Sequence, residues 1–239
     1  MQSELRTLTS TDLRVSSTTA LDTLGSAGYT ADNRQFSYVG VGATAVTAGQ
    51  LLVTPAVVAN HQGISIASGS KTAAGTNSLT LTLGATAATK DQYADGFLTV
   101  VTNTGAGYAY RIKGNSVGLS SGTIILDLYN DEPLITAVDS TTTFNLSANP
   151  YANLIASTTA SHAVGVAASN IAANAFGWVQ TYGMCSVLIK GSISKGNSVI
   201  QSTATAGAVA TTSGSAALLG NTLEACIDGQ YNSVWLQIT

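Results

Sequence analysis

Hydrophobic and polar residues alternate along much of this chain with the two-residue period of a β-strand. The clearest case is residues 78–83, where Leu79, Leu81 and Leu83 fall on one face and polar residues fall on the other. Residues 178–190 repeat the pattern over a longer run that places Cys185 on the apolar face. Both segments are therefore predicted to be half-buried strands.

Shorter runs rich in Val, Ile, Leu, Thr and Tyr recur between these two, separated by turns that contain glycine. The runs at 97–101 and 108–113 flank a Gly105/Gly107 turn and predict a β-hairpin. Many short strands with glycine turns are typical of sandwiches and barrels. The remaining predicted strands are 36–39, 51–54, 123–129, 198–200, 223–227 and 233–238.

The chain is predicted to fold as two β-sandwich or barrel-like units with an extended N-terminal arm, in the all-β class. Ser/Thr clusters and a Gly-Ser-Ala-Gly break interrupt residues 1–35, so this segment is predicted to be the arm. The first β domain is predicted over 36–148. The Asn149-Pro150 step then marks a boundary, and a C-terminal β-barrel-like domain is predicted over 149–239.

Charged residues are scarce, and this excludes several classes of protein. Only 9% of residues are charged, the net charge is −3, and there are nine Lys and Arg in 239 residues. Nine basic residues give no basic footprint for nucleic acid, and no apolar run approaches the length of a membrane-spanning helix. No signal peptide is visible at the start of the sequence.

One long segment carries no charge at all. No Asp, Glu, Lys or Arg occurs between Asp139 and Lys190. Such a segment is expected to be core, subunit interface, or both, because charged residues are depleted in the centres of interfaces. The composition favours a protein that is permanently assembled with its neighbours.

Two short motifs match catalytic or cofactor-binding patterns only in letters. Residues 118–122 read Gly-Leu-Ser-Ser-Gly, which matches the serine-hydrolase elbow, but a strand-like run follows where the elbow requires a helix. Residues 40–45 satisfy a loose dinucleotide fingerprint without a helix start after them. We interpret the first as a hairpin loop and the second as a β-turn.

Residues that ligate metals or act as nucleophiles are few and scattered. His61 and His162 have no partner at metal-ligand spacing. Asp127, Asp131 and Glu132 lie close together and are either a solvated strand end or an oxygen-ligand cation site. No catalytic, cofactor-binding or metal-binding residue is assigned, no cofactor is expected, and the chain is not predicted to be an enzyme.

The two cysteines are predicted to be unpaired. Cys185 falls on the apolar face of its strand, whereas the alternation places Cys226 on the face shared with Glu224 and Asp228. Opposite facing disfavours a disulfide between them.

A row of larger side chains lies on the opposite face from Cys185. It contains Trp178 and Tyr182, with Gln180 and Met184 in the same row. Two interpretations stay open. Either the row is exposed and anchors an interface, or it is core covered by another strand or by the N-terminal arm.

Several long segments resemble a family of virion structural proteins of tailed bacteriophages. They are residues 29–38, 83–89 and 92–97, the segment 177–188 that begins Gly-Trp-Val-Gln-Thr-Tyr-Gly-Met-Cys, and the closing segment 220–238. Together they cover most of the chain beyond the arm. The resemblance implies a head decoration, or cement, protein: β-rich, often trimeric, and bound to the outer surface of the major capsid protein lattice. It carries no active site to transfer.

The expected location is therefore the capsid surface of a virion, with the major capsid protein and two further copies of the chain as partners, and without direct contact to nucleic acid or membrane. The arm and one β face are expected to lie on capsid subunits. The candidate interface residues are Tyr29, Arg34, Phe36, Tyr38, Trp178 and Tyr182.

A receptor-binding or fibre-type adhesin of the virion is the alternative, because β-sandwich heads that bind glycans share this composition. Aromatic residues exposed in a loop cluster would favour it, but Trp178 and Trp235 lie in strand-like runs. A hydrolase acting on the cell envelope is a third hypothesis that the missing acid–base and metal constellations disfavour.

Overall fold

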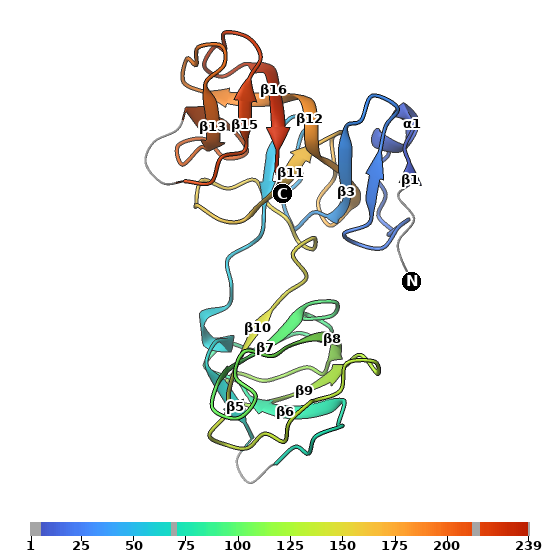
Figure 1. The fold of residues 1–239 in the computed structure, drawn as a ribbon, viewed down its shortest axis with the longest axis vertical. Helices are drawn as coiled ribbons and strands as arrows, with labels where there is room; N and C mark the ends of the chain where they lie inside the picture. The colour runs from blue at the N-terminus through green and yellow to red at the C-terminus, as the bar shows by residue number, and fades with distance from the viewer. Residues whose placement is uncertain (1–5, 68–70, 212–215, 239) are drawn as a thin grey trace. The chain divides into compact units, whose positions relative to one another are not determined.

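The fold is known from a computed structural model that describes residues 6–67, 71–211 and 216–238. Almost all regular structure in these residues is β, which confirms the predicted class. The chain divides into two compact units. Unit 1 combines the segment up to Pro55 with the segment from Tyr151 onward, and unit 2 is the continuous stretch Ala56–Pro150 (Figure 1).

Unit 1 is built on one large sheet whose longest strand is β12, Phe176–Lys190. Strand β12 pairs with β3 over its first half and with β16 over its second half, both antiparallel. The other strands extend the sheet from these pairs. The strands are β1 Arg6–Thr7, β2 Ala27–Tyr29, β3 Gln35–Gly40, β4 Leu51–Val53, β11 Ala163–Ala167, β13 Ser198–Gln201, β14 Val209–Thr211, β15 Gly220–Thr222 and β16 Tyr231–Gln237.

Unit 2 is a closed barrel with the strand order β10-β5-β6-β9-β8-β7, completed by the pairing of β10 with β7. Its inward residues alternate along each strand, as in β6, where Leu79 and Leu81 are buried, and they fill one hydrophobic core. The strands are β5 Ile64–Ile66, β6 Ser78–Thr82, β7 Phe97–Thr102, β8 Ala109–Asn115, β9 Thr123–Leu128 and β10 Thr143–Ser147; the 3-10 turn η1 spans Ala59–His61.

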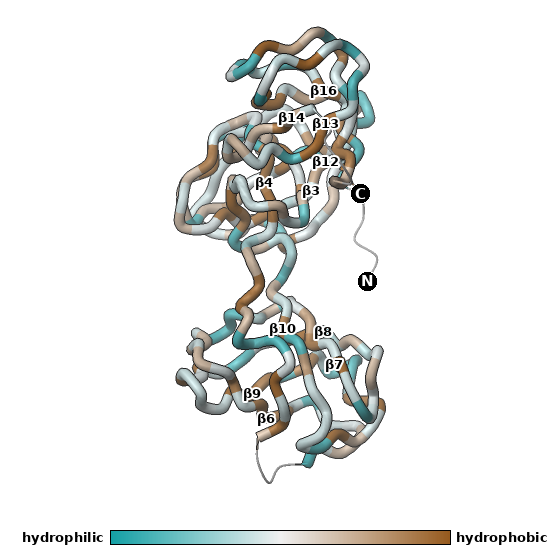
Figure 2. Tube along the Cα trace, turned by 90° about the vertical axis from the view of Figure 1, so that its left-hand side faces the viewer, coloured by the Kyte–Doolittle hydropathy of each residue, from teal (hydrophilic) through white to brown (hydrophobic). Residues whose placement is uncertain are grey.

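The predicted strands at 78–83, 97–101, 108–113 and 123–129 are therefore all present, and β7 and β8 form the predicted hairpin. Figure 2 shows brown, hydrophobic stretches running through the strands of each unit. The strand predicted over 223–227 does not form. Strand β15 ends at Thr222, just before this segment, and within it Cys226 makes only an isolated bridge to Ile193.

The division into units differs from the predicted one at its first boundary. The domain boundary predicted between residues 148 and 149 lies two residues from the observed boundary between 150 and 151. The boundary predicted between residues 35 and 36 does not exist, because both residues lie within unit 1. Strands β3 and β4 pair with β12 and β11, more than 100 residues later in the chain. Unit 2 is thus an insertion between β4 and β11, and β3 and β4 belong to the same unit as the C-terminal half.

The described part of the segment predicted as an extended arm, from Arg6 onward, is folded as part of unit 1 rather than standing apart (Figure 1). Strand β1 pairs with β2 and β2 pairs with β3, which adds the segment to the edge of the sheet. The short helix α1, Ser10–Leu13, starts with a capping box between Thr9 and Asp12. Leu8 and Leu13 are buried in one cluster with side chains of β3 and β12. Contacts within the chain therefore order this segment.

Candidate functional site

Three of the six candidate interface residues belong to the core. Phe36, Tyr38 and Trp178 are at most 3% exposed, and Leu8 and Leu13 of the N-terminal segment pack on them. The prediction that they contact a partner is wrong for these three side chains. For Trp178, the second interpretation, a core residue covered by the N-terminal arm, is the one that the structure supports.

The other three candidates are partly exposed. Tyr29 lies on β2 opposite Gln35. Arg34 donates from Nε to Asp32 at 2.9 Å, and its guanidinium lies 5.7 Å from the centre of the Phe36 ring. These side chains remain available to a partner.

The third, Tyr182, stands at a bend in β12. The register with β3 shifts between Gln180 and Tyr182, and Gly183 has a φ of +91°. Such an irregularity redirects a strand, so β12 changes neighbours from β3 to β16 at this point. The Tyr182 ring packs edge-on against Trp235, with centroids 5.7 Å apart.

Tyr182 lies at one end of an exposed face that β12 and β16 form together. Met184 lies directly opposite Trp235, and Ser186 lies opposite Ser233. Met184 is 50% exposed and Trp235 is 38% exposed, whereas the intervening Cys185 and Val234 point into the core. No outward residue of this row is charged. The β12–β16 face comprises Tyr182, Met184, Ser186, Tyr231, Ser233, Trp235 and Gln237.

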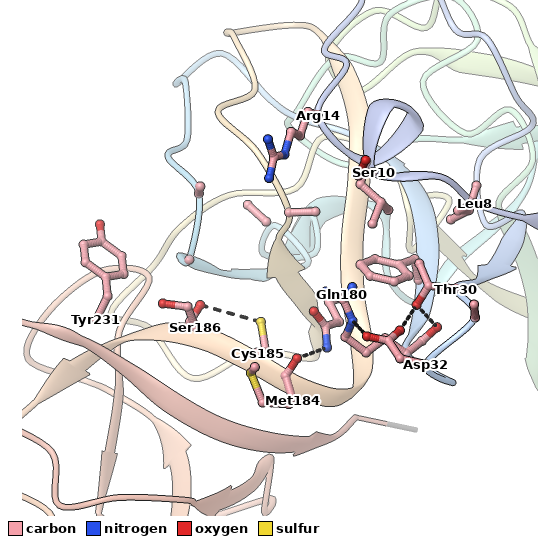
Figure 3. A pocket seen from close by; sticks show the side chains of 18 residues that line it. Leu8, Ser10, Arg14, Thr30, Asp32, Gln180, Met184, Cys185, Ser186 and Tyr231 are labelled. Carbon is pink, nitrogen blue, oxygen red and sulfur yellow. Dashed lines mark hydrogen bonds and ion pairs between the residues drawn. The ribbon is translucent and has the colours of Figure 1, made fainter.

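An open cleft of about 890 Å³ adjoins the β12–β16 face within unit 1. Figure 3 shows it between the end of α1, where Arg14 stands, and the segment of β12 that carries Gln180, Met184 and Ser186. Its walls combine apolar groups with a few polar ones. The lining includes Leu13, Arg14, Asp32, Arg34, Phe36, Ala48, Gly49, Ala167, Ala168, Gln180, Met184, Ser186 and Tyr231. We call this space the β12 cleft.

The β12 cleft contains more basic than acidic side chains, and only one of its two arginines forms an ion pair within the described ranges. Thr30 and Arg34 both donate to Asp32, and these contacts hold the pKa of Asp32 below its usual value of 3.8. Arg14 makes no ion pair with any residue that the structure describes. The lining therefore carries two guanidinium groups against one carboxylate, in a chain whose net charge is −3.

The thiol of Cys185, which also lines the β12 cleft, is largely buried. Cys185 is 8% exposed, and burial raises its pKa to about 12. Cys226 is 4% exposed and free, as predicted, but it lies in the same hydrophobic cluster as Cys185 rather than on an opposite face. The alternation failed there because residues 223–227 form no strand: Cys226 makes only an isolated bridge with Ile193, outside the named strands.

The motif at 118–122 is the loop between β8 and β9, as interpreted from the sequence. Gly118 forms an isolated bridge with Ala88, and the Ser120 hydroxyl donates to the carbonyl of Ala85 at 2.8 Å. The serine is thus a loop-stabilising group. The segment at 40–45 leads out of β3 and starts no helix.

His61 is a structural residue of unit 2. Its ring is fully buried and contacts the Tyr93 hydroxyl through Nδ1 and the Thr86 carbonyl through Nε2 at 2.9 Å. Both ring nitrogens are thereby occupied.

The acidic residues near the end of β9 are partly neutralised by one arginine. Arg111 binds Glu132 through Nε at 2.7 Å and approaches Asp131 at 3.6 Å. Its guanidinium also lies 4.3 Å from the centre of the Tyr129 ring. Within the described residues, no group of three or more His, Cys, Asp and Glu side chains is placed to hold a metal ion.

Sequence reasoning reached part of this surface. It identified Tyr182 and placed Met184 and Gln180 in the same row, but it did not single out Arg14 or the exposure of Trp235. The β12 cleft joins segments that lie far apart in the chain, and no local signal connects them.

None of the helices in the described ranges has the length and apolar character needed to span a membrane. Comparisons with protein-family models, with curated proteins and with solved structures found no match to this chain.

Proposed function

We propose that this chain is a structural virion protein, a decoration or cement protein that binds the major capsid protein lattice and stabilises the head of a tailed bacteriophage. It acts without catalysis and without a cofactor, as a homotrimer on the outer capsid surface. The observation that carries the proposal is the uncharged β12–β16 face, where Met184 and Trp235 stand opposite each other and exposed.

The β12–β16 face suits a permanent contact. Aromatic residues and Met are enriched at interfaces, and immobilising an aromatic ring costs less entropy than immobilising a long charged chain. Tyr182 holds the Trp235 ring edge-on, so the ring is ordered before any partner arrives. Preorganised groups of this kind typically dominate the energy of an interface.

Repetition on a lattice supports weak individual contacts. A trimer that engages several capsid subunits gains avidity without a stronger contact at any one of them. The scarcity of charged residues also supports assembly, because a net charge near zero favours association between proteins. Residues 140–189 contribute both core positions, such as Val179, and the outward Tyr182 and Met184.

The experiment is a binding assay on assembled phage heads that lack their decoration protein. Purified chain is mixed with the heads, and bound protein is measured by sedimentation and located by image reconstruction. Saturable binding at fixed lattice positions, with greater resistance of the heads to heat, is expected. A stable monomer that stays in the supernatant at every concentration contradicts the proposal.

A binding variant sharpens the assay. Trp235→Glu places a charge in the centre of the β12–β16 face and is expected to weaken head binding at least tenfold. Leu21→Glu is the matched control, because Leu21 is 63% exposed and lies outside that face. Equal binding by the two variants removes the β12–β16 face from the interface.

The Tyr182–Trp235 pair also favours a second candidate, the virion adhesin. Exposed aromatic rings beside a cleft are suited to stacking on sugar rings, and the β12 cleft adjoins this pair. A glycan array distinguishes the two functions. Selective glycan binding that Trp235→Ala abolishes, together with no binding to heads, favours the adhesin.

A further inference from the structure

The β12 cleft contains a short stretch of sheet edge without a neighbouring strand. In the half of β12 beyond the register shift at Gln180, odd-numbered residues direct their backbone groups toward β16, since Ile189 donates to Gln230 at 2.9 Å and Ile238 donates to Thr181 at 3.0 Å. Even-numbered residues therefore face the other edge. Leu188 follows this rule, because its N–H donates to the carbonyl of Gly49 at 2.9 Å.

That second edge is covered at both ends and open in the middle. Strand β3 pairs with β12 as far as Tyr182, after the register shift, and the loop at Gly49 contacts this edge again at Leu188. Between these points, no described strand pairs with this side of residues 184–186. The gap lies in the β12 cleft, whose lining includes Met184 and Ser186.

One side chain caps part of the open edge. Gln180 is 4% exposed, and its Nε2 donates to the carbonyls of Tyr182 at 3.0 Å and Met184 at 2.8 Å. Both hydrogens of the amide are thereby used. Figure 3 shows the bond to Met184 and the position of Gln180 in the cleft.

Two backbone donors are left over. The N–H groups of Met184 and Ser186 face this edge, where no described strand pairs with them and no described loop or side chain accepts a hydrogen bond from them. Backbone donors strongly favour pairing, and an unpaired strand edge is a template for another extended chain. Ala48, Gly49, Ala167 and Ala168 also line the cleft, and their small side chains leave space in it.

The positive charge of the β12 cleft indicates which kind of extended peptide would bind along this edge. Arg14 is unpaired within the described residues, and Arg34 bonds Asp32 through Nε. A guanidinium binds a carboxylate with strong, charge-assisted hydrogen bonds. An acidic side chain on the incoming segment complements this excess of positive charge.

We propose that the open edge of β12 at Met184 and Ser186 binds an extended, acidic peptide segment of a protein partner by strand addition. The segment accepts hydrogen bonds from the two free N–H groups and places a carboxylate near Arg14. Main-chain pairing supplies affinity in this mode, and the side chains supply specificity. The inference does not depend on whether the partner is a capsid protein.

The test uses two fluorescein-labelled peptides of alternating valine and threonine, one with a central glutamate and one with a central lysine. Fluorescence anisotropy of the full-length protein is expected to show at least tenfold tighter binding of the glutamate peptide. Arg14→Glu is expected to abolish or reverse this preference. Lys90→Glu is the matched control, because it makes the same charge change on an exposed residue of unit 2.

The backbone contribution is tested separately. Ser186→Pro removes one free N–H on the open edge, where proline is tolerated, and is expected to weaken binding at least tenfold. Ser186→Ala keeps the N–H and is expected to bind like the wild type. If the proline variant does not fold, hydrogen exchange in the wild-type protein replaces it. The amides of Met184 and Ser186 must then exchange more slowly when the glutamate peptide is present.

Several outcomes overturn the inference. They are no measurable binding of the glutamate peptide, equal binding of the two peptides, and unchanged exchange at both amides. Binding of an acidic oligosaccharide such as oligogalacturonate that Ser186→Pro leaves intact assigns the β12 cleft to a saccharide instead. A change of oligomeric state in Arg14→Glu without peptide binding assigns it to a second copy of the chain. Head binding is a separate assay, so the two proposals fail independently.

Discussion

Tyr38 lies opposite Trp178 in the β3–β12 pair, with ring centroids 5.1 Å apart and an angle of 63° between the rings. Both side chains are at most 3% exposed because the N-terminal segment covers them. This contact joins the beginning of the chain to its longest strand. It explains why a segment with weak periodicity of its own is part of the fold.

Removing one of the covering side chains tests this role. Leu13→Ala is expected to destabilise unit 1 by about 2–3 kcal/mol through lost burial and the cavity left behind. The emission of Trp178 is expected to shift to longer wavelength as water approaches. Leu21→Ala, at a position that is 63% exposed, is expected to change stability by less than about 0.5 kcal/mol. Equal losses for the two variants would mean that Leu13 does not seal the cluster.

The two units are expected to unfold separately, and the sequence provides a spectroscopic means of following each. Both tryptophans, Trp178 and Trp235, belong to unit 1. Tyr93→Phe leaves His61 Nδ1 without its partner in the core of unit 2, at an expected cost of about 1–3 kcal/mol. The urea transition seen by circular dichroism is expected to shift, and the one seen by tryptophan fluorescence is expected to stay. A shift of both transitions together would show that the units unfold as one.

The cysteines give a prediction about pH. Burial raises the pKa of Cys185 to about 12 from an ordinary value of 9.0. A raised pKa favours the folded state fully below pH 9, and this contribution is lost as the pH rises from 9 toward 12. At pH 8, a thiol reagent is expected to leave both cysteines unmodified in the folded protein and to modify both in denaturant. Rapid modification of the folded protein would contradict the burial of the two thiols.

Gly49 is expected to resist substitution for two reasons. Its φ is +81°, and a Cβ at this position would lie 2.6 Å from the Tyr231 ring and 3.1 Å from the carbonyl oxygen of Ser186. Gly191 has the same φ but nothing within 4 Å of its Cβ position. Gly191→Ala is expected to cost about 1–2 kcal/mol from backbone strain alone.

Gly49→Ala is expected to cost more than Gly191→Ala and to reduce peptide binding, because Tyr231 must move at the edge of the β12 cleft. Thermal unfolding of the two variants measures the difference. Equal losses of stability would show that the steric contact with Tyr231 has no effect.

The sequence by itself determined the β class and most strand positions, because side chains alternate between core and solvent at a fixed two-residue period. In β6 and β12, this period marks Leu79, Leu81, Cys185 and Val187 as inward. It also identified the loop at 118–122, since a strand rather than a helix follows. Each of these conclusions depends only on neighbouring residues.

Only the tertiary structure decided which strands are partners. The pairing of β3 with β12 makes unit 2 an insertion and buries Phe36, Tyr38 and Trp178. The β12 cleft arises in the same way, where the pairing of β3 with β12 ends at Tyr182 and the Gly49 loop contacts Leu188. Alternation specifies which face of a strand is apolar, but it does not specify what covers that face. The covering segments are distant in the chain, and their contacts form only when the whole unit folds.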